Sequence, residues 1–576
     1  MTRLIIYMKP YTRLILFAVL LLFIQATCDL ALPDYMSDIV NKGIMNGDSG
    51  YIFKIGMKML GVALLGMTCS TAVGLLASRT AAGVSKDLRA NIFEKVESFS
   101  NREFDRFSAS SLITRTTNDI TQIQMLLVMM IRLVIYAPIL GVGGVIHALA
   151  KSKSMSWIIG VAVVMLLGLI LVMFTLAMPK FKKIQTMIDK LNLVVRENLA
   201  GMLVIRAFRT QRFEEKRFDQ ANRELTDTNL YVNRVMSGMM PAMMLIMNLI
   251  TVLVVWVGSK QVSALQMDVG DMMAYIQYVM QIIMAFLMMS MMFIQIPRSS
   301  VSAVRIAEVL ETEPSITNHP HPVELKERVQ GAVAFKDVTF TYPGAEKPVL
   351  HRINFTAYPG QTTAFIGSTG SGKSTLINLI PRFYDPTEGE VLIDGIDIKK
   401  LTLHDLRQNL GYVPQKGILF SGTIQSNLRY ADENAAESEM LKAAEIAQAM
   451  EFIESKPEGF HTLISQGGSN VSGGQKQRLS IARALLKSPQ IFIFDDSFSA
   501  LDFKTDANLR AALKEQTASS TILIVAQRIS TIMNADQIIV LEQGRIVGQG
   551  THRELLDTCE VYREIAVSQL SKEELN

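Results

Sequence analysis

The chain has 576 residues, of which 49% are hydrophobic and 19% charged, and its formal net charge at pH 7 is +4. This length exceeds what one hydrophobic core organises, so several domains are expected, and the small net charge argues against a nucleic-acid-binding protein. The three cysteines, Cys28, Cys69 and Cys559, are too few and too scattered for a disulfide framework or a zinc cluster.

Apolar residues concentrate in the first 300 residues, in stretches long enough for helices across a hydrocarbon core of ~30 Å. These stretches are residues 14–32, 52–77, 125–148, 157–178, 236–257 and 272–296. The first resembles a secretory signal because Arg3, Lys9 and Arg13 precede it, but no small-residue cleavage site follows cleanly and further apolar stretches do. We therefore predict six transmembrane helices, of which the first is retained.

The connections between these stretches alternate between short and long, and the long ones, residues 78–124 and 179–235, are basic. Their basic residues are Arg79, Lys86, Arg89, Lys95, Arg102, Arg106, Arg115, Lys180, Lys182, Lys183, Lys190, Arg196, Arg206, Arg209, Arg212, Lys216, Arg217, Arg223 and Arg234. Because positive residues stay on the cytoplasmic side, both termini and both long connections are predicted to be cytoplasmic. The first short connection, with Asp34, Asp38 and Asp48, is then outside, and the absence of organelle-targeting features favours a bacterial inner membrane.

The long connections carry helical periodicity of their own. Leu88, Ile92 and Val96 recur at helical spacing, and neither connection contains a proline between residues 78 and 124 or between residues 181 and 240. We therefore expect each to consist of two helical extensions joined by a short crosswise turn, near residues 105–112 and 210–218. Such tips could press on a cytoplasmic domain.

Prolines mark the end of the membrane part. Pro314, Pro320 and Pro322 break the helical pattern, and after them residues 333–342 and 349–357 read as strands. The predicted organisation is a transmembrane domain over residues 1–310, a linker over 311–330 and a cytoplasmic nucleotide-binding domain over 331–576.

A glycine-rich loop follows an apolar run and precedes a helical one. It fits G-x-x-x-x-G-K-[ST] at Gly367, Gly372, Lys373 and Ser374, a pattern that wraps backbone N–H groups round phosphates. Lys373 can reach the β- and γ-phosphates, and the Ser374 hydroxyl can bind Mg²⁺. The residues expected to bind ATP here are Gly367, Ser368, Thr369, Gly370, Ser371, Gly372, Lys373, Ser374 and Thr375.

Two further motifs accompany this loop. Four apolar residues lead into Asp495, a buried strand that would deliver a carboxylate to hold Mg²⁺ beside the phosphates. Ser472, Gly473, Gly474 and Gln475 open a helix and form a second possible seat for an anion.

Together these motifs resemble the ATP-binding-cassette superfamily, and the six preceding stretches resemble its exporter branch. The resemblance covers almost the whole chain and implies an α-helical transmembrane bundle of six long helices followed by an α/β P-loop ATP-binding cassette. It implies that Tyr342 stacks on adenine and that Gln415 contacts Mg²⁺ and water. It also implies that residues 499–502 cross an interface between two cassettes. In this family each ATP lies between the phosphate loop of one cassette and the Ser-Gly-Gly-Gln motif of the other, so one chain cannot complete a site.

The sequence departs from the family pattern where hydrolysis occurs. After the magnesium aspartate the family normally has Glu, which polarises the attacking water, and this chain has Asp496, one methylene shorter. Gln527 takes the place of the switch histidine, and glutamine cannot carry the charge that histidine can. Gln466 stands where relatives usually have an acidic residue, and we interpret this substitution as without effect on function. A displacement of about 1 Å can cost ~10²-fold in rate, so we expect a degenerate site that binds ATP and hydrolyses it slowly.

Slow hydrolysis at both sites of a homodimer would impair transport, whereas an intact Ser-Gly-Gly-Gln motif can complete a competent site on another chain. We therefore predict a heterodimer with a second half-transporter, which supplies a Glu after its magnesium aspartate and a switch His. Membrane lipid and a small hydrophobic substrate are the other expected partners, and nucleic acid is not.

The substrate is indicated only by methionines in the last two stretches. They are Met236, Met239, Met240, Met243, Met244, Met247, Met272, Met273, Met280, Met284, Met288, Met289, Met291 and Met292. Flexible methionines suit a cavity for varied apolar ligands, although they can equally replace leucine facing lipid. Arg132 and His147 lie in the third stretch, and Arg132 is close enough to the inner surface to snorkel.

We therefore expect ATP-driven efflux of hydrophobic or amphipathic compounds. The alternatives are a lipid or peptide exporter of the same architecture, and a regulatory ATP-binding subunit that gates its partner.

Overall fold

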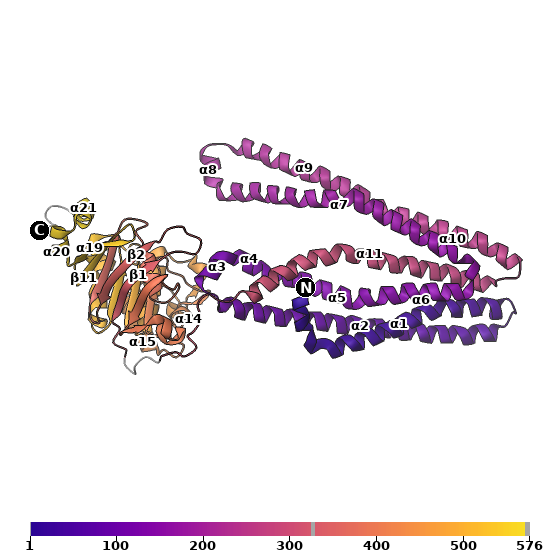
Figure 1. The fold of residues 1–576 in the computed structure, drawn as a ribbon, viewed down its shortest axis with the longest axis horizontal. Helices are drawn as coiled ribbons and strands as arrows, with labels where there is room; N and C mark the ends of the chain where they lie inside the picture. Colours follow the sequence, from indigo (N-terminus) through magenta and orange to yellow (C-terminus); the bar gives the residue numbers. More distant parts are fainter. Residues whose placement is uncertain (1, 324–328, 571–576) are drawn as a thin grey trace. The chain divides into compact units, whose positions relative to one another are not determined.

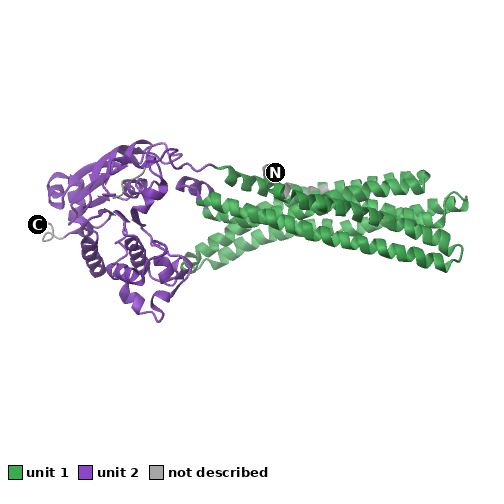
Figure 2. Cartoon of the chain, turned by 90° about the horizontal axis from the view of Figure 1, so that it is seen from below, with its two compact units in different colours: residues 1–97, 109–312 green, residues 98–108, 313–576 purple. Residues whose placement is uncertain are grey.

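A computed structural model describes residues 2–323 and 329–570, except for the side chains of residues 2–5, 174, 182, 291, 293, 294, 297 and 298. The side chains of Arg3, Lys182 and Met291, named above, therefore lie outside the description, as do residues 324–328 of the predicted linker and residues 571–576. Contacts divide the chain into two compact units, residues 1–97 with 109–312 and residues 98–108 with 313–576 (Figure 2). Each unit is described by itself.

The first unit is built of long helices (Figure 1). They are α1 (Thr12–Asp38), α2 (Ser49–Glu97), α4 (Ala109–Thr114), α5 (Ile120–Met129), α6 (Ile135–Lys151), α7 (Ser156–Ala200), α8 (Met202–Ala207), α9 (Gln211–Ser237), α10 (Met239–Ser263) and α11 (Val269–Glu311). Short 3₁₀ or π segments at η1 (Thr2–Tyr11), η2 (Ile39–Ile44), η3 (Arg115–Asp119), η4 (Met130–Val134) and η5 (Lys153–Met155) join several of them. Within the described residues, 6 helical stretches are long and apolar enough to cross a membrane, which confirms the predicted number.

The core of this unit lies where α1, α6, α7, α10 and α11 meet. Tyr275 and Tyr278 of α11 are fully buried there, and their hydroxyls donate to the carbonyls of Met155 and Leu30 at 2.8 and 3.0 Å. Burial of aromatic side chains with their polar ends satisfied stabilises the bundle without leaving an unpaired donor.

A polar cluster closes the bundle where α6 ends. The Lys151 ammonium lies 3.1 Å from a carboxylate oxygen of Asp34 in α1 and 2.8 Å from one of Asp271 in α11. His147 contacts the other Asp34 oxygen at 3.1 Å, and the Ser37 hydroxyl donates to Asp271 at 2.6 Å. One cation thereby joins three helices that are far apart in sequence.

The long connections continue as helices, as predicted, and α7 and α9 lie side by side (Figure 1). The second crosswise turn lies earlier than expected, because the short α8 at residues 202–207 forms the tip and residues 211–218 already belong to α9. The bends are at Gly201, whose φ of −91° and ψ of 9° leave the helical region, and at Arg209, with φ 55°. Neither bend carries a proline, so the helical period did not reveal them.

The second unit holds two main sheets and the helices around them. The strands are β1 (Val333–Phe340), β2 (Leu350–Ala357), β3 (Thr362–Gly367), β4 (Glu388–Ile393), β5 (Ile396–Asp397), β6 (Leu410–Val413), β7 (Gly422–Thr423), β8 (Leu463–Ile464), β9 (Ile491–Asp495), β10 (Thr521–Val525), β11 (Gln537–Glu542) and β12 (Arg545–Gly550). The helices are α3 (Asn101–Phe107), α12 (Lys373–Leu379), α13 (Leu403–Gln408), α14 (Ile424–Leu428), α15 (Glu437–Ile446), α16 (Met450–Glu454), α17 (Gly473–Leu486), α18 (Phe503–Gln516), α19 (Ile529–Ile532), α20 (His552–Thr558) and α21 (Glu560–Gln569).

The larger sheet positions the predicted site. Its order is β12-β11-β3-β10-β9-β6, and β3, β6, β9, β10 and β11 run parallel. The carboxyl ends of parallel strands meet at one edge, so the segments that follow β3, β6, β9 and β10 converge there. A second sheet, β2-β1-β4-β5, is antiparallel.

The tip of the first long connection belongs to this second unit. Helix α3 begins with a capping box between Ser100 and Glu103 and ends at Ser108, whose φ is 55°. The Tyr384 hydroxyl donates to the Asp105 carboxylate at 3.1 Å, and the Ser100 and Ser315 hydroxyls are 2.7 Å apart. The first tip, at residues 98–108, lies earlier than the predicted turn at residues 105–112, and it contacts cassette residues, as expected.

Candidate nucleotide site

The phosphate loop connects β3 to α12 through backbone that only glycine adopts readily. Gly367, Gly370 and Gly372 have φ values of 154°, 83° and 99°. A Cβ at Gly367 would collide with the Leu541 carbonyl, and one at Gly372 would lie 2.8 Å from a Leu350 methyl group. These glycines let the loop fold tightly at the start of α12, where the backbone N–H groups of a helix start can bind an anion.

Lys373 closes over this loop. Its ammonium donates to the carbonyls of Gly367 and Ser368 at 2.8 and 2.9 Å. Burial lowers the pKa of Lys373, while the carboxylates of Asp496 and Asp495 oppose that shift. A cation held by its own loop is thus placed where phosphate oxygens would bind.

A hydroxyl and a carboxylate meet beside the lysine. The Ser374 hydroxyl donates to Oδ1 of Asp495 at 2.8 Å, at the carboxyl end of β9. Burial raises the pKa of Asp495, and Asp496 adds to this, whereas Ser374 and Lys373 act in the other direction. Because hard oxygen ligands are what Mg²⁺ prefers, this pair fits the magnesium ion that accompanies a nucleotide.

The Asp496 carboxylate accepts hydrogen bonds from two side-chain amides. Its Oδ2 accepts from Gln415 at 3.1 Å and from Gln527 at 2.8 Å, and its backbone φ is 47°. The carboxyl ends of β6, β9 and β10 therefore bring together the three residues that the sequence had associated with water and γ-phosphate. Burial is also the largest influence on Asp496 and raises its pKa.

These residues surround a cavity of about 330 Å³. Its lining includes Lys373, Ser374, Gln415, Asp496 and Gln527. Val349 and Val525 also line it, and sequence reasoning missed both because an apolar side chain carries no chemical motif. Only their positions, just before β2 and at the end of β10, could have indicated them.

Tyr342 lies next to this cavity without lining it. Its hydroxyl is 3.0 Å from the Thr375 hydroxyl, and its ring packs edge-on against Phe340 and Tyr384. The contact with Thr375 brings the tyrosine to the end of the phosphate loop, and its stacking on adenine stays a prediction.

The Ser-Gly-Gly-Gln motif forms the start of α17. Ser472 caps the helix, since its hydroxyl accepts from the Gln475 N–H at 3.3 Å and its own N–H donates to the Gln475 side chain at 2.9 Å. None of residues 472–475 is among the described residues that line the cavity at Lys373. The motif and the phosphate loop of one chain therefore belong to separate places.

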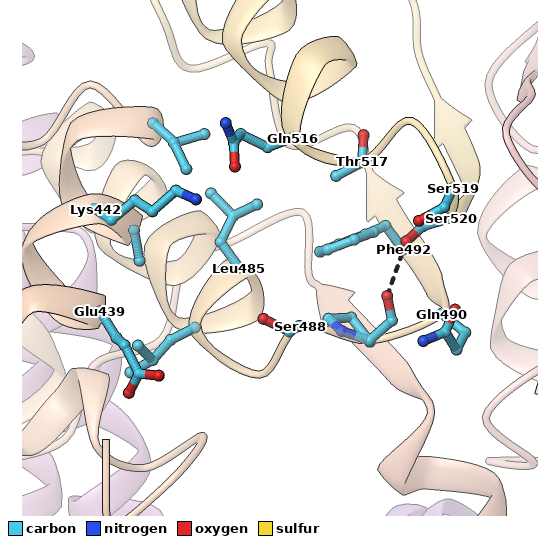
Figure 3. A pocket seen from close by; sticks show the side chains of 14 residues that line it. Glu439, Lys442, Leu485, Ser488, Gln490, Phe492, Gln516, Thr517, Ser519 and Ser520 are labelled. Carbon is cyan, nitrogen blue, oxygen red and sulfur yellow. Dashed lines mark hydrogen bonds between the residues drawn. The ribbon is translucent and has the colours of Figure 1, made fainter. Parts of the chain in front are cut away.

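A different cavity of the same unit, of about 340 Å³, carries none of the predicted chemistry (Figure 3). Glu439, Lys442, Leu485 and Phe492 line it, and the only hydrogen bond drawn there is the 3.1 Å one from Ser520 to the Pro489 carbonyl. It contains no residue of the phosphate loop or of the motif at Ser472.

Comparisons with known proteins match both parts of the chain. A model of the ABC transporter transmembrane region matches residues 15–286, and an ABC transporter model matches residues 350–499. The chain is 42% identical to an uncharacterized ABC transporter ATP-binding protein of Mycobacterium tuberculosis over 98% of this chain and 97% of that one. It is 34% identical to the ATP-dependent lipid A-core flippase of Pseudomonas aeruginosa, over 96% and 93%.

Among solved structures, a bacterial Atm1-family ABC exporter with ATP bound matches with a TM-score of 0.80 and 25% identity, over 97% of this chain and 99% of that one. Membrane region, cassette and order along the chain are thus the same. The protein belongs to the ABC transporter family, as an exporter-type half-transporter with one membrane region fused to one ATP-binding cassette.

Proposed function

We propose that the chain is the subunit of a heterodimeric exporter whose own phosphate loop binds ATP with Mg²⁺ but hydrolyses it slowly. The observation that carries this is the pair of amide donors, from Gln415 and Gln527, on one oxygen of Asp496. A carboxylate that polarises water must offer a free oxygen at the right distance. Asp496 is one methylene shorter than Glu, and because two amides bond to its Oδ2, it has one carboxylate oxygen, Oδ1, left to polarise water.

Gln527 strengthens the argument because it stays neutral at every pH. An imidazole in its place could carry a proton toward the γ-phosphate, whereas an amide can only hydrogen-bond. ATP held at Lys373 would therefore favour closed cassettes for longer than ATP at a site with Glu and His.

The second site would combine the partner's phosphate loop with residues 472–475 of this chain. Cassette closure would turn the membrane cavity outward, and hydrolysis mainly at that second site would reset it. In this arrangement both termini and the cassette are cytoplasmic, in a bacterial inner membrane.

The test is ATP turnover by the purified chain alone and with the product of a neighbouring half-transporter gene. We expect little turnover alone, loss of complex turnover when the partner's corresponding glutamate becomes glutamine, and a gain when Asp496→Glu is combined with Gln527→His. Brisk turnover by the chain alone would refute both the slow site and the need for a partner.

The proposed cargo is a hydrophobic or amphipathic small molecule. Met240 and Met244 of α10 are 70% and 65% exposed on the isolated chain, which supports a methionine-lined surface that can adapt to varied apolar ligands. Stimulation of ATPase activity by chemically unrelated amphiphiles would support this cargo.

Lipid export is the second candidate, because several relatives are named ATP-dependent lipid A-core flippase. Stimulation by a glycolipid alone, with no response to small amphiphiles, would favour it over multidrug efflux.

A further inference from the structure

An acidic residue lies inside the membrane part of the first helix. Asp29 belongs to α1, within the apolar stretch of residues 14–32, and is partly buried. A carboxylate at that depth is costly, so such residues face a bundle interior and mark binding or transport pathways.

Residues of three other helices lie near Asp29, and one of them bonds to its carboxylate. The Tyr136 hydroxyl of α6 donates to Oδ2 of Asp29 at 2.6 Å, and the Gln281 amide of α11 donates to the Asp29 carbonyl at 2.9 Å. A Cβ added at Gly66 of α2 would lie 3.7 Å from Oδ1. Tyr136 lies about halfway along the apolar stretch of residues 125–148, whereas Asp29 lies near the end of the stretch of residues 14–32.

The site has more acceptors than donors. Oδ1 of Asp29 makes no hydrogen bond within the described residues, and no Lys, Arg or His of that set forms an ion pair with this carboxylate. The neighbouring Oε1 of Gln281 is buried and likewise has no hydrogen-bond partner there. Asp34 and Asp271 differ, because each forms an ion pair with Lys151.

The surroundings offer apolar contact as well. Leu30 and Leu140 are buried in the adjoining core, and the Tyr136 ring packs partly buried against the same core. A carboxylate, an aromatic ring and aliphatic walls together suit an organic cation, through charge-assisted hydrogen bonding and cation–π attraction.

We propose that Asp29 anchors a subsite for the protonated amine of lipophilic amines, with its free Oδ1 taking an ammonium N–H and the Tyr136 ring lying against the cation. The proposal deepens the proposed amphiphile export and names a substrate class for it. Asp29 thereby becomes a specificity-determining residue of the membrane domain.

The experiment compares two probes of one shape, 1-naphthylmethylamine, which is cationic at pH 7, and the neutral 1-naphthylmethanol. Binding to the full complex in nanodiscs is measured by equilibrium dialysis for wild type, Asp29→Asn and Tyr136→Phe. Asp29→Asn keeps an acceptor for the Tyr136 hydroxyl and removes only the charge, and elution volume and thermal unfolding verify its folding.

We expect Asp29→Asn to weaken binding of the amine by about tenfold or more, as for the loss of one charge-assisted hydrogen bond. Binding of the alcohol should stay unchanged. Tyr136→Phe should retain most amine binding, because the carboxylate remains. The proposal fails, and Asp29 is structural, if Asp29→Asn leaves amine binding unchanged or weakens binding of the amine and of the alcohol equally. It also fails if Asp29→Asn and Tyr136→Phe have the same effect on amine binding.

A different result would show that the proposed export of amphiphiles is wrong. If no amphiphile, charged or neutral, stimulates ATP turnover by wild type, the proposed export of amphiphiles fails whatever the dialysis shows. If neutral amphiphiles stimulate turnover and the amine binds equally to wild type and Asp29→Asn, only the subsite fails.

Discussion

The side-chain amide of Gln527 donates to Oδ2 of Asp496 across 2.8 Å. Gln527→Glu would place a second carboxylate there, and like charges so close disfavour each other. We expect it to lower the apparent Tm by several degrees, since a domain of 150–250 residues loses about 2–4 °C per kcal/mol. Gln527→Met is the matched control, which removes the donor without adding charge and should cost less. Equal Tm values for the two variants would contradict the contact.

Lys373 should dominate nucleotide affinity. Its ammonium is held at the loop by Gly367 and Ser368 and can form charge-assisted hydrogen bonds with phosphates, each contributing about 1.5–3 kcal/mol. Lys373→Ala should therefore weaken binding of a fluorescent ATP analogue by about 10- to 150-fold. Lys373→Arg should have an affinity between those of wild type and Lys373→Ala, because a planar guanidinium fits this loop less well than an ammonium. Unchanged affinity in Lys373→Ala would show that the nucleotide binds elsewhere.

Nucleotide binding should depend on pH through magnesium. Burial raises the pKa of Asp495 above its ordinary 3.8, so this carboxyl takes up a proton at higher pH than an exposed one. Protons compete with Mg²⁺ for the same oxygens, and the magnesium-dependent part of ATP affinity should fall as the pH is lowered through the raised pKa. Titrations between pH 8 and 5, with Mg²⁺ or with EDTA, measure this difference.

Ser374→Ala tests the other member of the pair, and because it removes a hydroxyl expected to bind Mg²⁺, it should also weaken magnesium-dependent binding at every pH. The Ser374 hydrogen bond lowers the pKa of Asp495, so its removal should shift the loss of magnesium-dependent binding to higher pH. A shift to lower pH, or equal pH dependence with EDTA, would contradict the proposed magnesium pair.

Arg115 should stabilise the first unit. It is 9% exposed, and its guanidinium donates to the Arg305 carbonyl at 2.6 Å and to Glu308 at 2.8 Å. Arg115→Met should destabilise the chain by about 1–3 kcal/mol, because the Arg305 carbonyl and the partly exposed Glu308 carboxylate lose a buried charged donor. Glu308→Gln keeps an acceptor and should cost less, as measured by thermal unfolding in detergent. A larger effect of Glu308→Gln would contradict this ranking.

Local sequence predicted the phosphate loop well, because glycines, lysine and serine act within a few residues of one another. The strand ending at Asp495 could be predicted equally well, since a fully buried parallel strand appears in the sequence as a continuous apolar run. The contact between Asp496 and Gln527 was not, because it depends on β9 pairing with β10 so that Asp495 stands opposite Val525. Sheet order is a property of the whole domain.

The membrane part shows the same division. Apolar length predicted the 6 spanning helices found in the described residues. It could not predict that Asp29 meets Tyr136, because residues 107 positions apart become neighbours only through helix packing. The early turn at α8 was missed because helical period continues on both sides of a bend that has no proline.

Lys151 has a consequence for how the bundle can open. Its ammonium is shared by Asp34 and Asp271, so a movement that parts α1 from α6 would break the contact with Asp34 and leave that carboxylate without its ammonium partner. Dissolved ions weaken such ion pairs, since the screening length of electrostatic interactions is about 8 Å at physiological ionic strength. The ease with which these helix ends separate is therefore set partly by the salt in the water that bathes them.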